Sequence, residues 1–381
     1  MRDQLQRDQY VRPWPALSCV ARRSPPVRRT CNRTAAASLA AIALGALFAT
    51  PAQAQPDPSG IDFVTLGAPG NTGWAGRGRP DQWIGRGGVS YEYRIGRFEV
   101  TSQQWAEFFS AAFDRPANDR LPHLQVPQFW GATPATPNTP GGQRWVTPPG
   151  NEMIPVGNIS WRMAAMYCNW LHNDKSILRN AFLDGAYDVS TFGYINGDVA
   201  TDQAAHHPGA RYWIPTLDEM IKASHYDPNK PNPDGTTGGY WLYSNGSDQP
   251  WVGAPPASMG GNGTANFGWR TNDFPGANPY AVPLGAYPTT NPWGLFDIAG
   301  GSSEWTEEVL TGTGGVRYWV HDGSFRAGTQ GNGVLDAIYA AGGEFPSFPF
   351  PNFGLRIATI PSPPTLALLV LPLLSRRRRL S

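Results

Sequence analysis

The chain has 381 residues, 40% of them hydrophobic, with 15 Trp, 14 Tyr and 17 Phe, which excludes a disordered protein, a coiled coil and a helical bundle. The 44 Gly and 38 Pro instead indicate a compact fold with long irregular connections. The net charge of +1 conceals two basic ends. When residues 1–54 and the last four arginines are left out, the rest of the chain has 18 basic and 27 acidic residues, a net charge of about −9. An acidic body argues against nucleic-acid binding, which needs a basic face.

The N-terminal residues 1–54 have the pattern of a secretory signal. Arginines precede an apolar run over 35–49, and Ala52-Gln53-Ala54 follows as a signal-peptidase site. We therefore expect export and a mature chain that begins at Gln55.

Three segments of the body are predicted as helices. Thr101 opens a T-x-x-Q capping box before a one-sided apolar stripe. Ser160 caps a second helix, and Thr216 with Glu219 forms another capping box for a short helix that runs to Ser224. The stripe residues of the first two are Trp105, Phe108, Phe109 and Ala112, then Met163, Met166, Tyr167, Trp170 and Leu171.

Short strands are expected between these helices, and the remainder reads as loops. The predicted strands are Tyr91–Phe98, Arg211–Ile214, Tyr318–Val320 and Phe353–Ala358. Stretches rich in Pro, Gly and Asn cover 131–150, 228–239, 244–263 and 270–292. Loops of this length in a compact domain are usually functional or supported by a ligand.

The C-terminal residues 360–381 resemble a PEP-CTERM sorting tail. A Pro-Ser-Pro motif precedes a short apolar run and four arginines, and Ser362 stands where that tail has Glu. The run is too short to span a bilayer. The resemblance implies transient membrane attachment, recognition by exosortase-type sorting machinery, and delivery to the outer cell surface or extracellular matrix of a Gram-negative bacterium.

The order of motifs over 95–359 resembles the sulfatase-modifying factor domain, the family of formylglycine-generating enzymes. The resemblance implies an α+β, C-type-lectin-like fold with few regular elements and long loops. The organisation is then a leader at 1–54, an approach segment at 55–94, this domain at 95–359 and the sorting signal at 360–381. The motifs are Ile95–Thr101, Pro155–Trp161, Ala165–Leu171, Tyr212–Glu219, Trp293–Ile298, Ser303-Glu304-Trp305 and Asn352–Ala358.

The family's reaction needs a copper ion held by two cysteines, and both are replaced here. The positions that match the family's pair are Ala327 and Asn332, and Ser303 replaces an active-site Trp. Beyond residue 31 the chain has one cysteine, Cys168, so neither a disulfide nor a two-thiolate Cu(I) site can form in the body. We expect no copper and assign no catalytic residue.

The resemblance also implies a calcium site. Its positions match Asp297, Gly300, Ser302 and Glu304, of which Glu304 would give a side-chain oxygen and the others backbone carbonyls. A structural alternative is that Glu304 caps a turn. Ser324, Asn352 and Arg356 match candidate groove positions, with turn and core hydrogen bonding as the alternative.

The leading function is therefore that of an exported binding module without oxidase chemistry. Its partner would be an extracellular polysaccharide or another exported protein. The alternative is a divergent oxidoreductase or protein-modifying enzyme that uses another metal or site, and a third reading is a structural component of the matrix.

Overall fold

The computed structural model describes residues 56–76, 83–113, 115–135, 144–266, 274–322, 337–338 and 341–361. They belong to one unit that spans Ala54–Ser381. The leader and the sorting tail beyond residue 361 lie outside the described residues. Within the described part no helix is long and apolar enough to cross a membrane.

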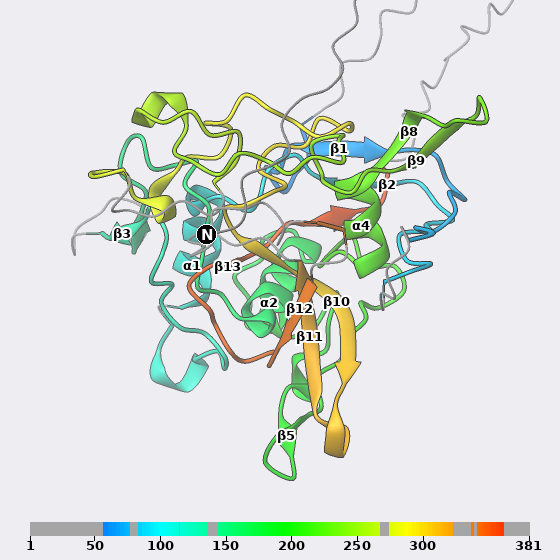
Figure 1. Ribbon diagram of the computed structural model, residues 1–381. Coiled ribbons are helices and arrows are strands. Elements are labelled where there is room, and N and C mark those ends of the chain that lie inside the picture. Colours follow the sequence, from blue (N-terminus) through cyan, green and yellow to red (C-terminus); the bar gives the residue numbers. More distant parts are fainter. Residues whose placement is uncertain are drawn as a thin grey trace, which may run out of the picture. The chain divides into compact units, whose positions relative to one another are not determined.

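Two four-stranded sheets form the framework (Figure 1). The first has the order β1-β2-β14-β7 and is antiparallel throughout. The second has the order β12-β11-β10-β13, in which only β10 and β13 are parallel. Their bounds are β1 Phe63–Leu66, β2 Tyr93–Gly96, β7 Tyr212–Trp213, β10 Ser303–Thr311, β11 Arg317–Asp322, β12 Ala341–Glu344, β13 Phe353–Gly354 and β14 Ala358–Thr359.

Three predicted helices are present and begin at the predicted caps. They are α1 Ser102–Ala112, α2 Trp161–His172 and α4 Leu217–His225, and a short α3 spans Asn180–Leu183. The Thr101 and Thr216 capping boxes are both formed. All but the last residue of α2 is buried, as expected of a helix surrounded by the rest of the domain.

The main core lies where α1 and α2 pack through aromatic side chains. The rings of Trp105 and Tyr167 are stacked with centroids 5.3 Å apart, and the ring centroids of Phe108 and Trp170 are 5.6 Å apart. All four side chains are buried. The apolar stripes read from the sequence therefore form one shared core.

Two sequence expectations are corrected by the sheets. The single strand expected over 353–358 is two strands, because Phe353 pairs with β10 while Ala358 pairs with β2 and β7. The loop expected over 228–239 is largely a hairpin, β8 Tyr226–Pro231 with β9 Thr237–Tyr240. Prolines do not prevent it because the pair stands apart from the sheets, where a missing N–H is tolerated.

Two smaller hairpins complete the described strands, β3 Thr133–Pro134 with β4 Trp145–Val146 and β5 Tyr194–Ile195 with β6 Val199–Ala200. The other connections are irregular, as Figure 1 shows. The α+β class with short strands, few helices and long loops is thus confirmed.

Candidate functional site

The loop before β10 carries the predicted calcium positions, and it is tightly turned. Asp297, Gly300 and Gly301 have φ values of 50°, 72° and 69°, a region that glycine enters without steric cost. The Gly301 N–H donates to the Asn266 carbonyl at 3.0 Å. A Cβ on Gly301 would approach the Glu99 Oε1 to 3.1 Å, so both the backbone angle and the close approach favour glycine.

Glu304 and Arg356 form a completely buried ion pair beside this loop. The Arg356 Nε donates to the Glu304 Oε1 at 3.0 Å, and neither side chain is exposed. Its other nitrogens donate to the carbonyls of Gly96 at 2.9 Å and Phe296 at 3.1 Å. The guanidinium therefore ties β10 to the first sheet and to the loop.

The oxygens of the loop fit a calcium ion by their chemistry. Glu304 would supply a carboxylate oxygen, and the turned backbone of Asp297, Gly300 and Ser302 would supply carbonyls, the hard oxygens that calcium prefers. Burial raises the pKa of Asp297 to about 6, although the Gly285 N–H and Arg356 oppose that rise. The described residues hold no cluster of three His, Cys, Asp or Glu side chains suited to a metal, so a cation here would depend on backbone carbonyls.

Two of the three candidate groove residues point into the fold. The Asn352 Nδ2 donates to the Ser303 Oγ at 3.1 Å, and the Ser303 N–H donates to the Asn352 carbonyl at 2.7 Å. Asn352 and Arg356 are both buried, and these contacts support their structural alternative. Ser324, Ala327 and Asn332 lie outside the described residues.

The one cysteine of the body lies on α2. Cys168 is fully buried, and burial raises its thiol pKa well above the usual value. A protonated, buried thiol is a poor nucleophile and a poor metal ligand.

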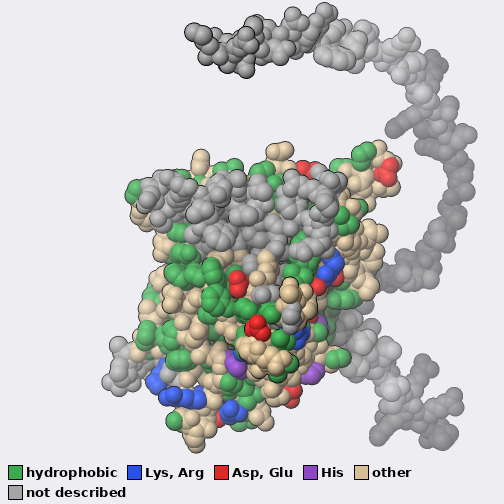
Figure 2. Space-filling view, turned by 60° about the horizontal axis from the view of Figure 1, so that its bottom comes forward, with side chains coloured by type: hydrophobic (Ala, Val, Ile, Leu, Met, Phe, Trp, Pro, Cys, Tyr) green, Lys and Arg blue, Asp and Glu red, His purple; other side chains and the backbone are tan. Residues whose placement is uncertain are grey.

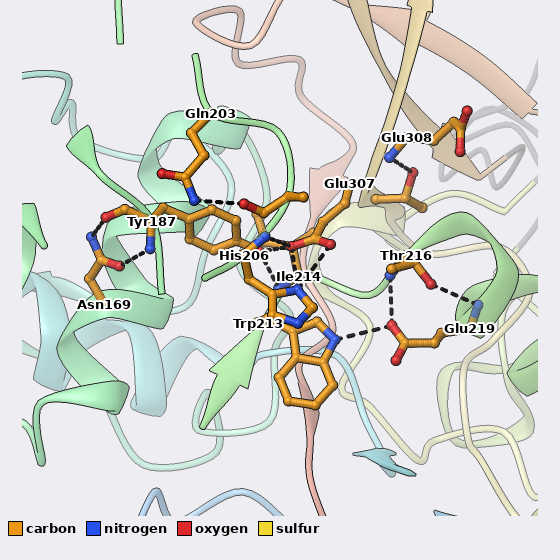
Figure 3. A network of polar contacts seen from close by, with 12 residues as sticks. Asn169, Tyr187, Gln203, His206, Trp213, Ile214, Thr216, Glu219, Glu307 and Glu308 are labelled. Atoms are coloured by element: carbon orange, nitrogen blue, oxygen red, sulfur yellow. Dashed lines mark hydrogen bonds and ion pairs between the residues drawn. The ribbon is translucent and has the colours of Figure 1, made fainter. Parts of the chain in front are cut away.

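A second polar cluster is centred on Glu307 of β10 (Figure 3). Its Oε1 accepts hydrogen bonds from the Tyr187 hydroxyl at 2.5 Å and from the His206 backbone N–H at 2.8 Å. The His206 Nδ1 lies 2.9 Å from the same oxygen. The Tyr187 hydroxyl accepts in turn from the Ile214 N–H at 2.9 Å. One carboxylate thus joins β10 to the loop around 206 and, through Tyr187, to Ile214, the residue that follows β7.

A second buried carboxylate, Glu219, flanks the same cluster. It accepts from the Trp213 Nε1 at 3.1 Å and from the Tyr91 hydroxyl at 2.9 Å. The His206 ring stacks on Trp213 with centroids 4.7 Å apart (Figure 3). Burial is the main reason that the pKa of Glu219 is raised, and the charge of Glu307 adds to it.

His206 reaches solvent, with a side chain 25% exposed. Burial alone would lower its pKa, but the hydrogen bond and charge of Glu307 outweigh burial, so the pKa is raised. Its Nδ1 faces Glu307, and the Nε2 makes no hydrogen bond to the described residues. A histidine oriented by a carboxylate in this way is a suitable general base.

The raised pKa predicts a pH-dependent stability that Glu307 controls. A histidine whose pKa is higher in the folded than in the unfolded state stabilises the folded protein when it is protonated. This stabilisation is complete at pH values below the unfolded-state pKa of about 6.5, and it is lost as the pH rises through the folded-state pKa. In the wild type the free energy of unfolding should therefore decrease as the pH rises above about 6.5, and we expect this decrease to be smaller in Glu307→Gln. Urea unfolding from about pH 5.5 to 8.5 measures it.

The control for this experiment is the next residue on the same strand. Glu308 pairs with the half-buried Arg86 and is not bonded to His206. Glu308→Gln should keep the wild-type slope, and equal slopes in all three proteins would remove His206 and Glu307 as the cause.

Sequence reasoning missed the cluster centred on Glu307. The neighbouring histidines His206 and His207 show no metal-binding spacing, and Glu307 is 101 residues away from His206. The available signal was local, because Glu307 follows the apolar Trp305 by two positions, the spacing that places residues of a regular strand on one face. An acidic residue at an inward position indicates a buried partner, but it does not identify one.

A polar cavity of about 670 Å³ lies along the first turns of α1. We call it the α1 cavity, and a smaller one of about 190 Å³ shares four of its lining residues. Its wall includes side chains of α1, β4 and the segment around 152, with Lys175 at the edge. It is a separate place from the Glu307 cluster, since the two have no residue in common.

Comparison with known proteins places residues 86–359 in a family described as the sulfatase-modifying factor enzyme 1-like domain. Among solved structures, CarF is 20% identical with a TM-score of 0.48, covering 80% of this chain and 100% of its own. Variable protein 1 of Treponema denticola is 19% identical, with a TM-score of 0.47 and coverage of 79% and 95%. PvdO from Pseudomonas aeruginosa is 13% identical, with a TM-score of 0.43 and the same coverage. No protein with a curated description matches the chain.

Proposed function

Because the chain belongs to the sulfatase-modifying factor enzyme 1-like family, we propose that it is an exported member that acts by binding, without the family's copper oxidase chemistry. The observation that carries this is the replacement of both copper-binding cysteines, by Ala327 and Asn332. Cu(I) requires soft thiolate ligands. Cys168 cannot substitute for them, because it is a single thiol in the core with a raised pKa.

Features of the body support the binding function. The α1 cavity has a volume typical of small-ligand sites, about 300–1,000 Å³. On the face drawn in Figure 2, a few basic side chains gather at the lower left, and acidic and histidine side chains are scattered among hydrophobic and uncharged ones. The coloured residues there form no continuous basic surface of the kind that nucleic acids need. A polysaccharide or another exported protein suits this surface better.

Export is tested by the mature ends of the protein. We expect mass spectrometry of the protein from the native host to find a chain that begins at Gln55, since Ala52-Gln53-Ala54 is the cleavage site. Processing by exosortase-type machinery would also remove the four terminal arginines. A full-length chain retained in the cytoplasm would contradict export.

Calcium is part of this proposal as a structural ion. When bound, it would supply positive charge and cross-link the loop of Asp297, Gly300, Ser302 and Glu304. One oxygen of the Glu304 carboxylate accepts a hydrogen bond from the Arg356 Nε, and the same carboxylate would supply the side-chain oxygen for calcium.

The second candidate function is an enzyme that uses another site, either a divergent oxidoreductase or a protein-modifying enzyme. The observation in its favour is the His206 and Glu307 pair, in which a carboxylate orients a partly exposed imidazole. If this pair acts as a base, Glu307→Gln should abolish a measured activity that Glu308→Gln preserves.

A further inference from the structure

The side chains that line the α1 cavity restrict the class of ligand more than its volume does. Small-ligand pockets are usually lined mainly by apolar side chains, with a few polar groups that orient the ligand. Here hydrogen-bonding side chains make up much of the wall, and Trp145 and Met153 provide apolar surface. The polar side chains include Ser59, Thr101, Gln103, Gln104, Glu107 and Glu152, together with Thr147 and Lys175.

Several of these polar groups remain available to a ligand. Gln103 is exposed, and its side-chain amide takes part in no hydrogen bond among the described residues. Glu152 accepts from the Gly150 N–H through one oxygen at 2.7 Å. Lys175 and Glu107 are paired at 2.7 Å at the edge, where both can bond a hydroxyl without losing each other.

The charge of the wall disfavours an anion. Glu107 and Glu152 line the α1 cavity, the buried Glu99 lines the adjoining one, and the single lysine already pairs with Glu107. A carboxylate or sulfate on the ligand would meet this acidic excess.

The start of α1 does not offset that excess. The N–H groups of Ser102 and Gln103 donate to the carbonyls of Ile154 and Glu152, and the Gln104 N–H donates to the Thr101 hydroxyl. These three donors of the first turn are therefore engaged within the fold. They do not make an anion-binding site of the kind that helix N-termini can provide.

We propose that the α1 cavity binds a neutral or amine-bearing oligosaccharide. Its hydroxyls would bond Gln103 and Glu152, and a sugar ring would lie against Trp145. The proposal rests on the proposed binding function and assigns it a site and a ligand class.

The test is calorimetric titration of the full chain with four probes: cellohexaose, a glucosamine hexamer, hexagalacturonate and hexalysine. We expect the first two to bind, with hexagalacturonate at least tenfold weaker. Gln103→Ala and Glu152→Gln should each weaken sugar binding about three- to tenfold, the range of one lost hydrogen bond. Alanine is a good helix former, so Gln103→Ala should leave the thermal stability unchanged.

Gln249→Ala and Glu92→Gln are the matched controls, because both side chains are exposed and neither lines the cavity. They should bind as the wild type does. Sugar binding unaffected by the two cavity variants would overturn the site while leaving the binding function intact. Equal affinity for hexagalacturonate, or binding of hexalysine alone, would overturn the ligand class. Binding of none of the four probes would overturn the proposal.

Discussion

Arg356→Met should lower the free energy of unfolding by about 3–5 kcal/mol, the cost of removing one partner from a buried ion pair. Both Arg356 and Glu304 are completely buried, so Glu304 would be left as a buried charge without its counterion. Arg356 also donates to two carbonyls, of Gly96 and Phe296, which would lose those donors. Chemical denaturation at pH 7 measures the change.

Asp174→Asn is the matched control for an exposed ion pair. Asp174 pairs with Arg211 at 2.5 Å, but its side chain is 74% exposed, and such pairs contribute about 0–1 kcal/mol. Its φ of 53° is one that asparagine also adopts readily. If both variants cost the same, the pair of Arg356 and Glu304 is not the central contact that we describe.

Calcium removal is the second prediction with a large effect. An ion that binds only the folded loop stabilises it by about 2.7 kcal/mol at a hundredfold excess over its dissociation constant. Extracellular sites bind calcium with dissociation constants of about 10⁻⁴–10⁻³ M. Melting in roughly 10 mM calcium should therefore be compared with melting in excess chelator, because these two conditions fill and empty such a site. At about 2–4 °C per kcal/mol, we expect the melting temperature to fall by several degrees in chelator.

The variants separate calcium binding from the ion pair. Glu304→Gln should destabilise the protein in both buffers, because it also breaks the contact with Arg356, and it should abolish most of the difference between them. Asp297→Asn should have a milder effect, since we assign it a backbone contribution. Glu308→Gln should keep the full response. A wild-type melting temperature that is equal in calcium and chelator would leave Glu304 with its structural role alone.

The helices could be predicted because their signals are local. The Thr101 and Thr216 capping boxes and the stripe around Phe108 each lie within a few residues of sequence, and all three formed as predicted. Strand pairing is different, because it depends on distant partners. Residues 353–358 look like one strand, but Arg356 lies between two short ones and its side chain crosses from β10 to the first sheet.

The same distinction applies to the site. The loop at 297–304 could be identified because its motif is contiguous, and its contact with Arg356 could not, because 52 residues separate the pair. The Glu307 cluster brings together residues 101 and 120 positions apart. The α1 cavity likewise combines residues from 59 to 175. No spacing rule in a single sequence predicts such combinations.

The most direct test of the account is an assay for aldehyde formation on a Cys-x-Pro-x-Arg peptide with copper and oxygen supplied. We expect no aldehyde above the level of a sample without the protein, because Ala327 and Asn332 provide no thiolates. Aldehyde that depends on this protein would contradict the loss of the oxidase chemistry, and with it the binding-module account.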